Sequence, residues 1–332
     1  MESAVVSSYI HLRPHDKVLS LVAWAIAVAL FASVGWMALQ PDDPRGAVSL
    51  LTRAGAWLTI LEIMALSAVV SGLATVLVGR KLPDAGVFAV ALGLAGAALR
   101  GDTTAYLLIN LANSDTAARG ALAWKLAGEG MVWFLVVAVA MISAGVVTRW
   151  HAAGAARAAP PACRAICLAD MPVLGGLLAP SGADQARRAR FDGLKTMCVS
   201  LVAAAILFRL FVTGSPLGSV QHGQTCFALV AALYLGGLIA YELYPARSAF
   251  WGCLSVPLLC LLGYVICALS SPPGGQYSDI ASVPPSSFYR ALPIQYISVG
   301  TVGAVASFWS ARRSAALRQV GAEASLTPRC QG

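Results

Sequence analysis

The sequence predicts an all-α integral membrane protein with about eight transmembrane helices. Of its 332 residues, 58% are hydrophobic and only 11% are charged, and the mean hydropathy is +0.74. A soluble domain carries about 25% charged residues, because its whole exterior faces water. The apolar residues are grouped into stretches long enough to cross a bilayer core of about 30 Å as helix. Together these observations exclude a soluble fold and intrinsic disorder.

Each predicted span is an apolar stretch with at most one charged residue. Most of these stretches approach the roughly 20 residues that a helix needs to cross a bilayer. The third stretch is the weakest, because its 15 residues rise only about 22 Å as helix. The predicted spans cover residues 18–39, 54–78, 85–99, 130–148, 196–214, 225–241, 249–269 and 291–311.

The distribution of Lys and Arg predicts that both termini are cytoplasmic. With the N-terminus inside, sixteen of the 23 Lys and Arg residues lie on the inner side and six on the outer side, while Arg209 lies within a span. This excess is the one that the positive-inside rule describes. The predicted divisions are a cytoplasmic arm (1–17), four spans (18–148), a basic cytoplasmic linker (149–195), four spans (196–311) and a cytoplasmic tail (312–332).

The loop lengths follow the same order in both halves of the chain. A medium outer loop, a short inner loop and a long outer loop join the four spans of each half. Because each half has an even number of spans, two such halves would be parallel repeats about an axis along the membrane normal. Coincidence explains three matching loops equally well, so the sequence leaves both interpretations open.

The net charge of +8 does not indicate a nucleic-acid partner, because the basic residues lie at span ends rather than on one patch. Arg187, Arg188 and Arg190 follow a capping-box pattern, which predicts a short basic helix leading into the fifth span. Such juxtamembrane residues attract anionic lipid, although a solvated charge cluster is the simpler interpretation. Arginine outnumbers lysine 19 to 4. This ratio is typical of a GC-rich bacterial genome and favours a bacterial cytoplasmic membrane.

Glu62 is the residue most indicative of a functional site, because it lies in the middle third of the second span. A charge there costs about 3 kcal/mol on insertion scales, and such residues usually face the bundle interior beside a partner. Arg209 is the natural partner, and Arg100 and Asp102 lie at the outer end of the third span. These four residues predict a polar substrate or ion site that opens to the outside. The alternative is a static ion pair that holds the two halves together.

The sequence contains no specific motif for catalysis, a cofactor or a metal. It lacks a phosphate-binding loop, a nucleophile elbow and an H-E-x-x-H motif, which mark the common catalytic sites. Cys253, Cys260 and Cys267 recur every seven residues on one face of the seventh span, where helix packing explains them better than metal binding. We therefore expect no cofactor and no metal, and an enzyme is disfavoured.

The favoured function is transport or permeation of a small solute or ion through a site near Glu62 and Arg209. The alternative is a non-catalytic structural or accessory subunit of a larger membrane complex. Two small-residue motifs, Gly93-x-x-Gly96 and Gly300-x-x-Gly303, suit close helix contacts within the chain, in a homo-oligomer or with other membrane proteins. A lipid-modifying enzyme and a membrane sensor are the remaining interpretations.

Overall fold

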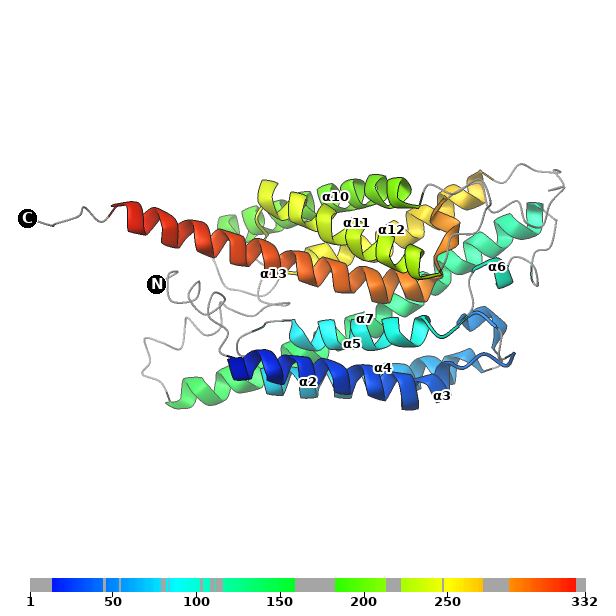
Figure 1. Ribbon diagram of the computed structural model, residues 1–332, viewed down its shortest axis with the longest axis horizontal. Helices are drawn as coiled ribbons and strands as arrows, with labels where there is room; N and C mark the ends of the chain where they lie inside the picture. Colours follow the sequence, from blue (N-terminus) through cyan, green and yellow to red (C-terminus); the bar gives the residue numbers. More distant parts are fainter. Residues whose placement is uncertain are drawn as a thin grey trace, which may run out of the picture.

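The structure is a computed structural model that describes most of the chain. The described residues are 14–43, 46–53, 55–78, 82, 84–101, 104–107, 111, 116–158, 183–212, 222–246, 248–270 and 287–326. Of these, 89% are helical and none lies in a strand. Figure 1 shows the long helices side by side in one bundle, with the start of α2 and the end of α13 at the same end. The prediction of an all-α protein is confirmed.

In the part of the chain that the structure describes, six helices are long and apolar enough to cross a membrane. The first is continuous, because a π-helical turn, η1 (Phe31–Gly35), joins α2 (Pro14–Leu30) to α3 (Trp36–Leu39). The others are α4 (Ala56–Val78), α7 (Thr116–Ala158), α10 (Ala183–Phe211), α11 (His222–Leu243) and α12 (Phe250–Leu269). Short elements lie in the connections between the long helices: η2 (Leu50–Thr52), α6 (Thr104–Leu107) and η4 (Ser287–Arg290).

Two further helices correspond to the third and eighth predicted spans, but neither belongs to the apolar six. Helix α5 (Ala85–Ala98) has only 14 residues, and most of them are buried. Helix α13 (Pro293–Leu326) is long, but it buries polar side chains such as Gln295, Ser298 and Thr301. A helix that is surrounded by protein needs neither the length nor the apolar surface of a helix that faces lipid. Both helices therefore occupy the middle of the bundle.

The helices form two groups of four that follow the order of the chain. Helices α2, α4, α5 and α7 pack against one another, and so do α10, α11, α12 and α13. Figure 1 shows the second group above α2, α4 and α5. The two groups meet where α7 contacts α12, where α5 contacts α13 and where α7 contacts α13. We call this contact region the boundary between the halves.

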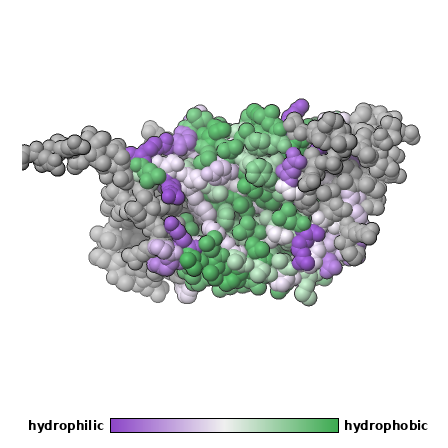
Figure 2. All heavy atoms as spheres, in the orientation of Figure 1, coloured by the Kyte–Doolittle hydropathy of each residue, from purple (hydrophilic) through white to green (hydrophobic). Residues whose placement is uncertain are grey.

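Apolar side chains cover the middle of the bundle on the face that Figure 2 shows, and polar residues gather toward its two ends. On α4, the exposed residues include Leu58, Val69 and Leu73, and on α10 they include Val202 and Ile206. Large exposed apolar surfaces mark contact with a membrane or a partner. Together with the six apolar helices, this belt is the surface of a multi-pass membrane protein in contact with the lipid bilayer.

Two predicted loops are partly helical. The outer segment predicted before residue 130 contains the first turns of α7, which begins at Thr116. Helix α7 has 43 residues, about 65 Å as helix, so it extends beyond a bilayer core. The predicted short basic helix and the fifth span are one continuous helix, α10. Residues 1–13 of the predicted N-terminal arm lie outside the described residues.

Glycines allow the central helices to approach closely. An added Cβ at Gly303 of α13 would lie 2.7 Å from the backbone oxygen of Val230 in α11. At Gly93 of α5, an added Cβ would overlap the ring of Phe31 in the π-helical turn. Both small-residue motifs therefore serve helix contacts within the chain.

We expect Gly303→Ala to destabilise the protein by about 1–3 kcal/mol, because the new methyl group would press against the Val230 backbone. Gly128→Ala is the matched control, since an added Cβ there meets nothing within 4 Å and Ala is favoured over Gly in a helix by roughly 1 kcal/mol. Thermal unfolding midpoints in one detergent would compare the variants. Equal midpoints for the two would contradict the close contact between α13 and α11.

Candidate functional site

The structure places Glu62 and Arg209 on exposed faces of two different helices. Glu62 belongs to α4 in the first half and Arg209 to α10 in the second, and Figure 1 draws these helices on opposite sides of the bundle. Within the described part of the chain, neither side chain forms a hydrogen bond or an ion pair. The pair that the sequence predicted therefore does not form within one chain. The assignment of both residues to a substrate or ion site stays a prediction.

Helical periodicity explains why Glu62 faces outward. The inward face of α4 is formed by Ile63, Ser67, Val70 and Ala74, all of which are buried. Side chains at spacings of three and four residues share one face of a helix. Glu62 precedes Ile63 by one residue, which turns it about 100° away from that face. The expectation that Glu62 faces the bundle interior was therefore wrong.

Arg100 has partners in the first membrane helix. Its Nη1 atom donates a hydrogen bond of 2.6 Å to the backbone oxygen of Ala32. Its guanidinium group also lies 4.5 Å from the ring centre of Trp36, a distance typical of cation–π contacts. Arg100 thus fastens the end of α5 to the π-helical region of the first span. Asp102, the fourth predicted site residue, lies outside the described residues.

A buried carboxylate that the sequence analysis missed, Glu129, joins α7 to the loop between α3 and α4. Ser49 donates a hydrogen bond of 2.6 Å to its Oε2, and the Leu50 backbone N–H donates one of 3.0 Å to its Oε1. The indole N–H of Trp133 donates a third, of 2.9 Å, to Oε1. Trp133 is only 1% exposed, so protein surrounds this contact. Its spacing of four residues from Glu129 was the one signal of this contact in the sequence.

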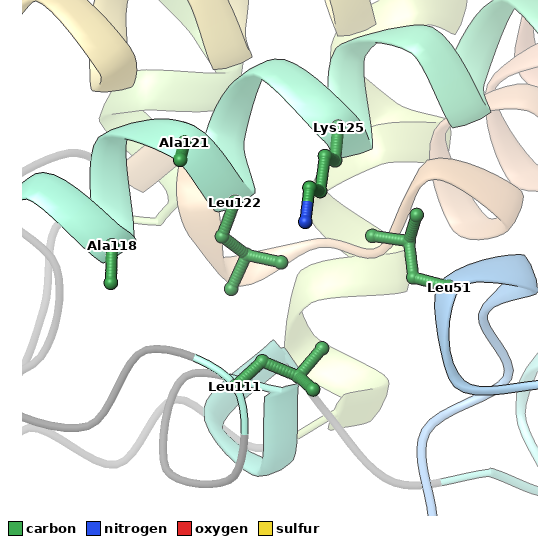
Figure 3. A pocket seen from close by; sticks show the side chains of 6 residues that line it. All are labelled: Leu51, Leu111, Ala118, Ala121, Leu122 and Lys125. Atoms are coloured by element: carbon green, nitrogen blue, oxygen red, sulfur yellow. The ribbon is translucent and has the colours of Figure 1, made fainter.

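A pocket of about 230 Å³ opens one helical turn before Glu129 (Figure 3). Lys125 extends its amine toward Leu51 and Leu122 in this view. The lining residues are Leu51, Leu111, Ala118, Ala121, Leu122 and Lys125. The side chains of the described lining residues are thus apolar except for the amine of Lys125. It is formed by the first turns of α7, by η2 and by a residue that follows α6.

A second buried carboxylate, Asp84, lies at the opposite end of the bundle, where α5 begins. It is 5% exposed and has a φ of +66°, the left-handed conformation that non-glycine residues rarely adopt. Within the described part of the chain, neither of its carboxylate oxygens has a hydrogen-bond partner. A buried acceptor without a partner is costly, and a strained backbone is typical of functional positions.

Asp84 belongs to the first half, and the ionisable groups that interact with it electrostatically belong to the second half. Arg312 of α13 influences its ionisation, and the charge of Asp84 acts on Tyr241 of α11 and Cys253 of α12. Asp84 therefore lies on the boundary between the halves. Burial raises the pKa of Asp84 to about 7, and the positive charge of Arg312 acts in the opposite direction. A carboxyl group with this pKa exchanges protons near neutral pH.

The cysteine stripe of α12 is buried along the same boundary. Cys253, Cys260 and Cys267 are all buried and free of disulfides. An added Cβ at Gly130 of α7 would lie 2.6 Å from the Cys260 sulfur. In the described residues, no cluster of three or more His, Cys, Asp or Glu side chains could hold a metal ion. The stripe is a packing surface between α12 and its neighbours.

Neither a protein-family model, nor a curated protein sequence, nor a solved structure matches the chain. Its function therefore has to be inferred from the geometry of the buried charges and the pocket.

We expect Asp84 to make the stability of the protein depend on pH. Its pKa rises from 3.8 in the unfolded chain to about 7 in the fold. Its contribution to stability is therefore complete below pH 4 and is lost as the pH rises through 7. Asp84→Asn cannot ionise, and asparagine tolerates the left-handed conformation. The variant should gain up to roughly 4 kcal/mol over the wild type at pH 8 and little at pH 4.

Unfolding in mixed detergent at the two pH values measures this difference. Asp192→Asn is the control, because Asp192 is half-exposed and pairs with Lys195 at 3.7 Å on the surface. The same gain for Asp84→Asn at both pH values would contradict the titration of a buried carboxyl group.

Proposed function

We propose that the protein moves a small solute or ion across the membrane along the boundary between its halves. In this proposal, Asp84 exchanges a proton or binds the transported cation near the inner side. The observation that supports it is the buried, strained Asp84 carboxyl group, which lacks a hydrogen bond within the described part of the chain. Ionisable residues inside membrane proteins usually line ion or proton pathways. A purely structural carboxylate would be expected to have donors, as Glu129 does.

The proposal includes eight spans, with α5 and α13 as the third and the eighth. The contacts across the boundary support two parallel four-helix repeats. The fourth helix of the first half, α7, contacts the third helix of the second half, α12, and the third helix of the first half, α5, contacts the fourth of the second, α13. A two-fold axis along the membrane normal would exchange these two contacts. Transporters built from repeats change access when one repeat rocks against the other.

The orientation is also part of the proposal. The excess of Lys and Arg at the end of the bundle that holds Asp84 supports cytoplasmic termini, and the predominance of arginine over lysine favours a bacterial cytoplasmic membrane. Arg190 is exposed near the start of α10, and we assign it, with Arg187 and Arg188, to anionic lipid of the inner leaflet. The side chains of Arg187 and Arg188 lie outside the described residues.

Proton flux into liposomes tests this function. A potassium gradient with valinomycin would drive protons into liposomes that hold a pH-sensitive dye. We expect the wild type to conduct and Asp84→Asn to retain at most about one-tenth of the flux, because asparagine cannot carry the proton. Asp192→Asn, outside the boundary, should conduct normally. Loss of flux in Glu62→Gln but not in Asp84→Asn would move the site to Glu62, and wild-type flux equal to that of empty liposomes would contradict transport of protons.

A second candidate function, an accessory subunit of a membrane complex, is favoured by the exposure of Glu62. This carboxylate lies among exposed Leu58, Leu61 and Val69 on α4, a face that would otherwise meet lipid tails. A charge in that position costs about 3 kcal/mol on insertion scales. A partner subunit or a second copy of the chain that supplies a cation, such as Arg209, would remove this cost. In this role, Glu62 and Arg209 would contribute to assembly surfaces on two different faces of the bundle, and Arg100 and Asp102 would lie at the predicted outer ends of such surfaces.

The accessory role predicts that Glu62→Leu weakens a defined assembly. The wild type in a mild detergent should carry a partner or a second copy at fixed stoichiometry, and Glu62→Leu should lose it because the charge contact is gone. Ile239→Leu, on an exposed face of α11, is the control for general surface effects. Light scattering gives the mass of each complex. A wild-type monomer would contradict the accessory role and leave transport unaffected.

A further inference from the structure

We infer that the pocket beside Lys125 binds a small amphipathic anion, a carboxylate or a phosphate monoester that carries a short apolar group. The pocket has a volume of about 230 Å³, and five of its lining residues are Leu or Ala. Lys125 extends into this apolar space (Figure 3). Ligand pockets commonly combine an apolar lining with one placed charge that orients the ligand.

The charge of Lys125 is available to a ligand. Within the described part of the chain, its amine forms no hydrogen bond and no ion pair. The nearest acid along α7 is Glu129, one turn further on, but it is buried on the inward face. Both Glu129 oxygens already accept hydrogen bonds from Ser49, Leu50 and Trp133. Lys125 is itself exposed, so an anion can reach its ammonium group from water.

The wall opposite Lys125 is held in place before a ligand arrives. Leu51 lies in η2, whose first turn is capped by Ser49: the Leu51 backbone N–H donates a hydrogen bond of 3.2 Å to the Ser49 hydroxyl. The Thr52 hydroxyl donates one of 3.1 Å to the Ser49 backbone oxygen. Ser49 and Leu50 donate hydrogen bonds to Glu129, which belongs to α7. The Leu51 wall is therefore anchored to the same helix that carries Lys125. A binding site whose side chains are already ordered spends little binding free energy on ordering them when the ligand arrives.

The lining also defines the source of the ligand. Leu51 belongs to the connection between α3 and α4 and Leu111 to the connection between α6 and α7, and the other lining residues come from the first turns of α7. The pocket therefore opens at the end of the bundle that carries these connections, on the predicted outer side. We assign its occupant to a free amphipathic anion from the outer aqueous phase rather than to a bilayer lipid. This inference is independent of the transport proposal, because it concerns binding alone.

Lysine labelling tests the inference on the full chain in phosphatidylcholine nanodiscs. The chain has four lysines, Lys17, Lys81, Lys125 and Lys195, so mass spectrometry can follow acetylation of each one. Hexanoate and hexyl phosphate should slow the acetylation of Lys125 at least threefold and leave Lys195 unchanged. Hexanol, which lacks the charge, and inorganic phosphate, which lacks the apolar group, should not protect Lys125.

Each other outcome overturns the inference. Equal protection by hexanol shows an apolar cavity only, and equal protection by inorganic phosphate shows a bare surface charge. Protection that requires anionic lipid in the nanodisc, without hexanoate, assigns the site to the bilayer. Leu51→Ala removes one wall and should abolish the protection while leaving the rate without ligand unchanged. Full protection in this variant, or none in the wild type, also contradicts the site, and in either case the Asp84 proposal still stands.

Discussion

The contact between α5 and α13 across the middle of the bundle is the feature on which the rest of the structure depends. Helix α5 and residues 293–311 of α13 are mostly buried, and each half contributes one of the two helices. Near the predicted inner end, an aromatic cluster reinforces the contact: the ring centre of Phe88 lies 4.8 Å from that of Trp24 and 4.9 Å from that of Trp309. Asp84 begins α5 at the same level. The arrangement of the two halves therefore determines the surroundings of the buried acid.

The two buried carboxylates show how the same chemical group serves different purposes. Glu129 has three hydrogen-bond donors and ties a loop to α7, so it stabilises the fold. Asp84 has none within the described part of the chain, and it is buried in a strained conformation. Burying such a group in a strained conformation destabilises the fold, and packing elsewhere in the protein has to offset this cost. This contrast is the physical reason for connecting function with Asp84 rather than with Glu129.

The transport and accessory roles assign importance to different surfaces of the molecule. Transport depends on the boundary between the halves, where movement of one half would change the access of water to Asp84. An accessory role depends on the outer faces of α4 and α10, where Glu62 and Arg209 lie on apolar surfaces. The Lys125 pocket is separate from both, because it is formed by α7 and the outer connections. One chain thus presents three places where charge and apolar surface meet.

The sequence by itself determined the fold class and the places of the long helices, because lipid requires long apolar stretches and these are visible as composition. All eight predicted stretches are helical among the described residues, and six of these helices are long and apolar enough to cross a membrane. The sequence also located the small-residue faces at Gly93 and Gly303. Only the tertiary structure decided which charges are buried, because this depends on helix rotation and on contacts between residues far apart in the chain. Glu62 lies inside a span but faces outward, whereas Asp84 and Glu129 lie just outside predicted spans and are covered by neighbouring segments. Depth along a helix is local information, but the direction of a side chain depends on what the rest of the chain places beside it.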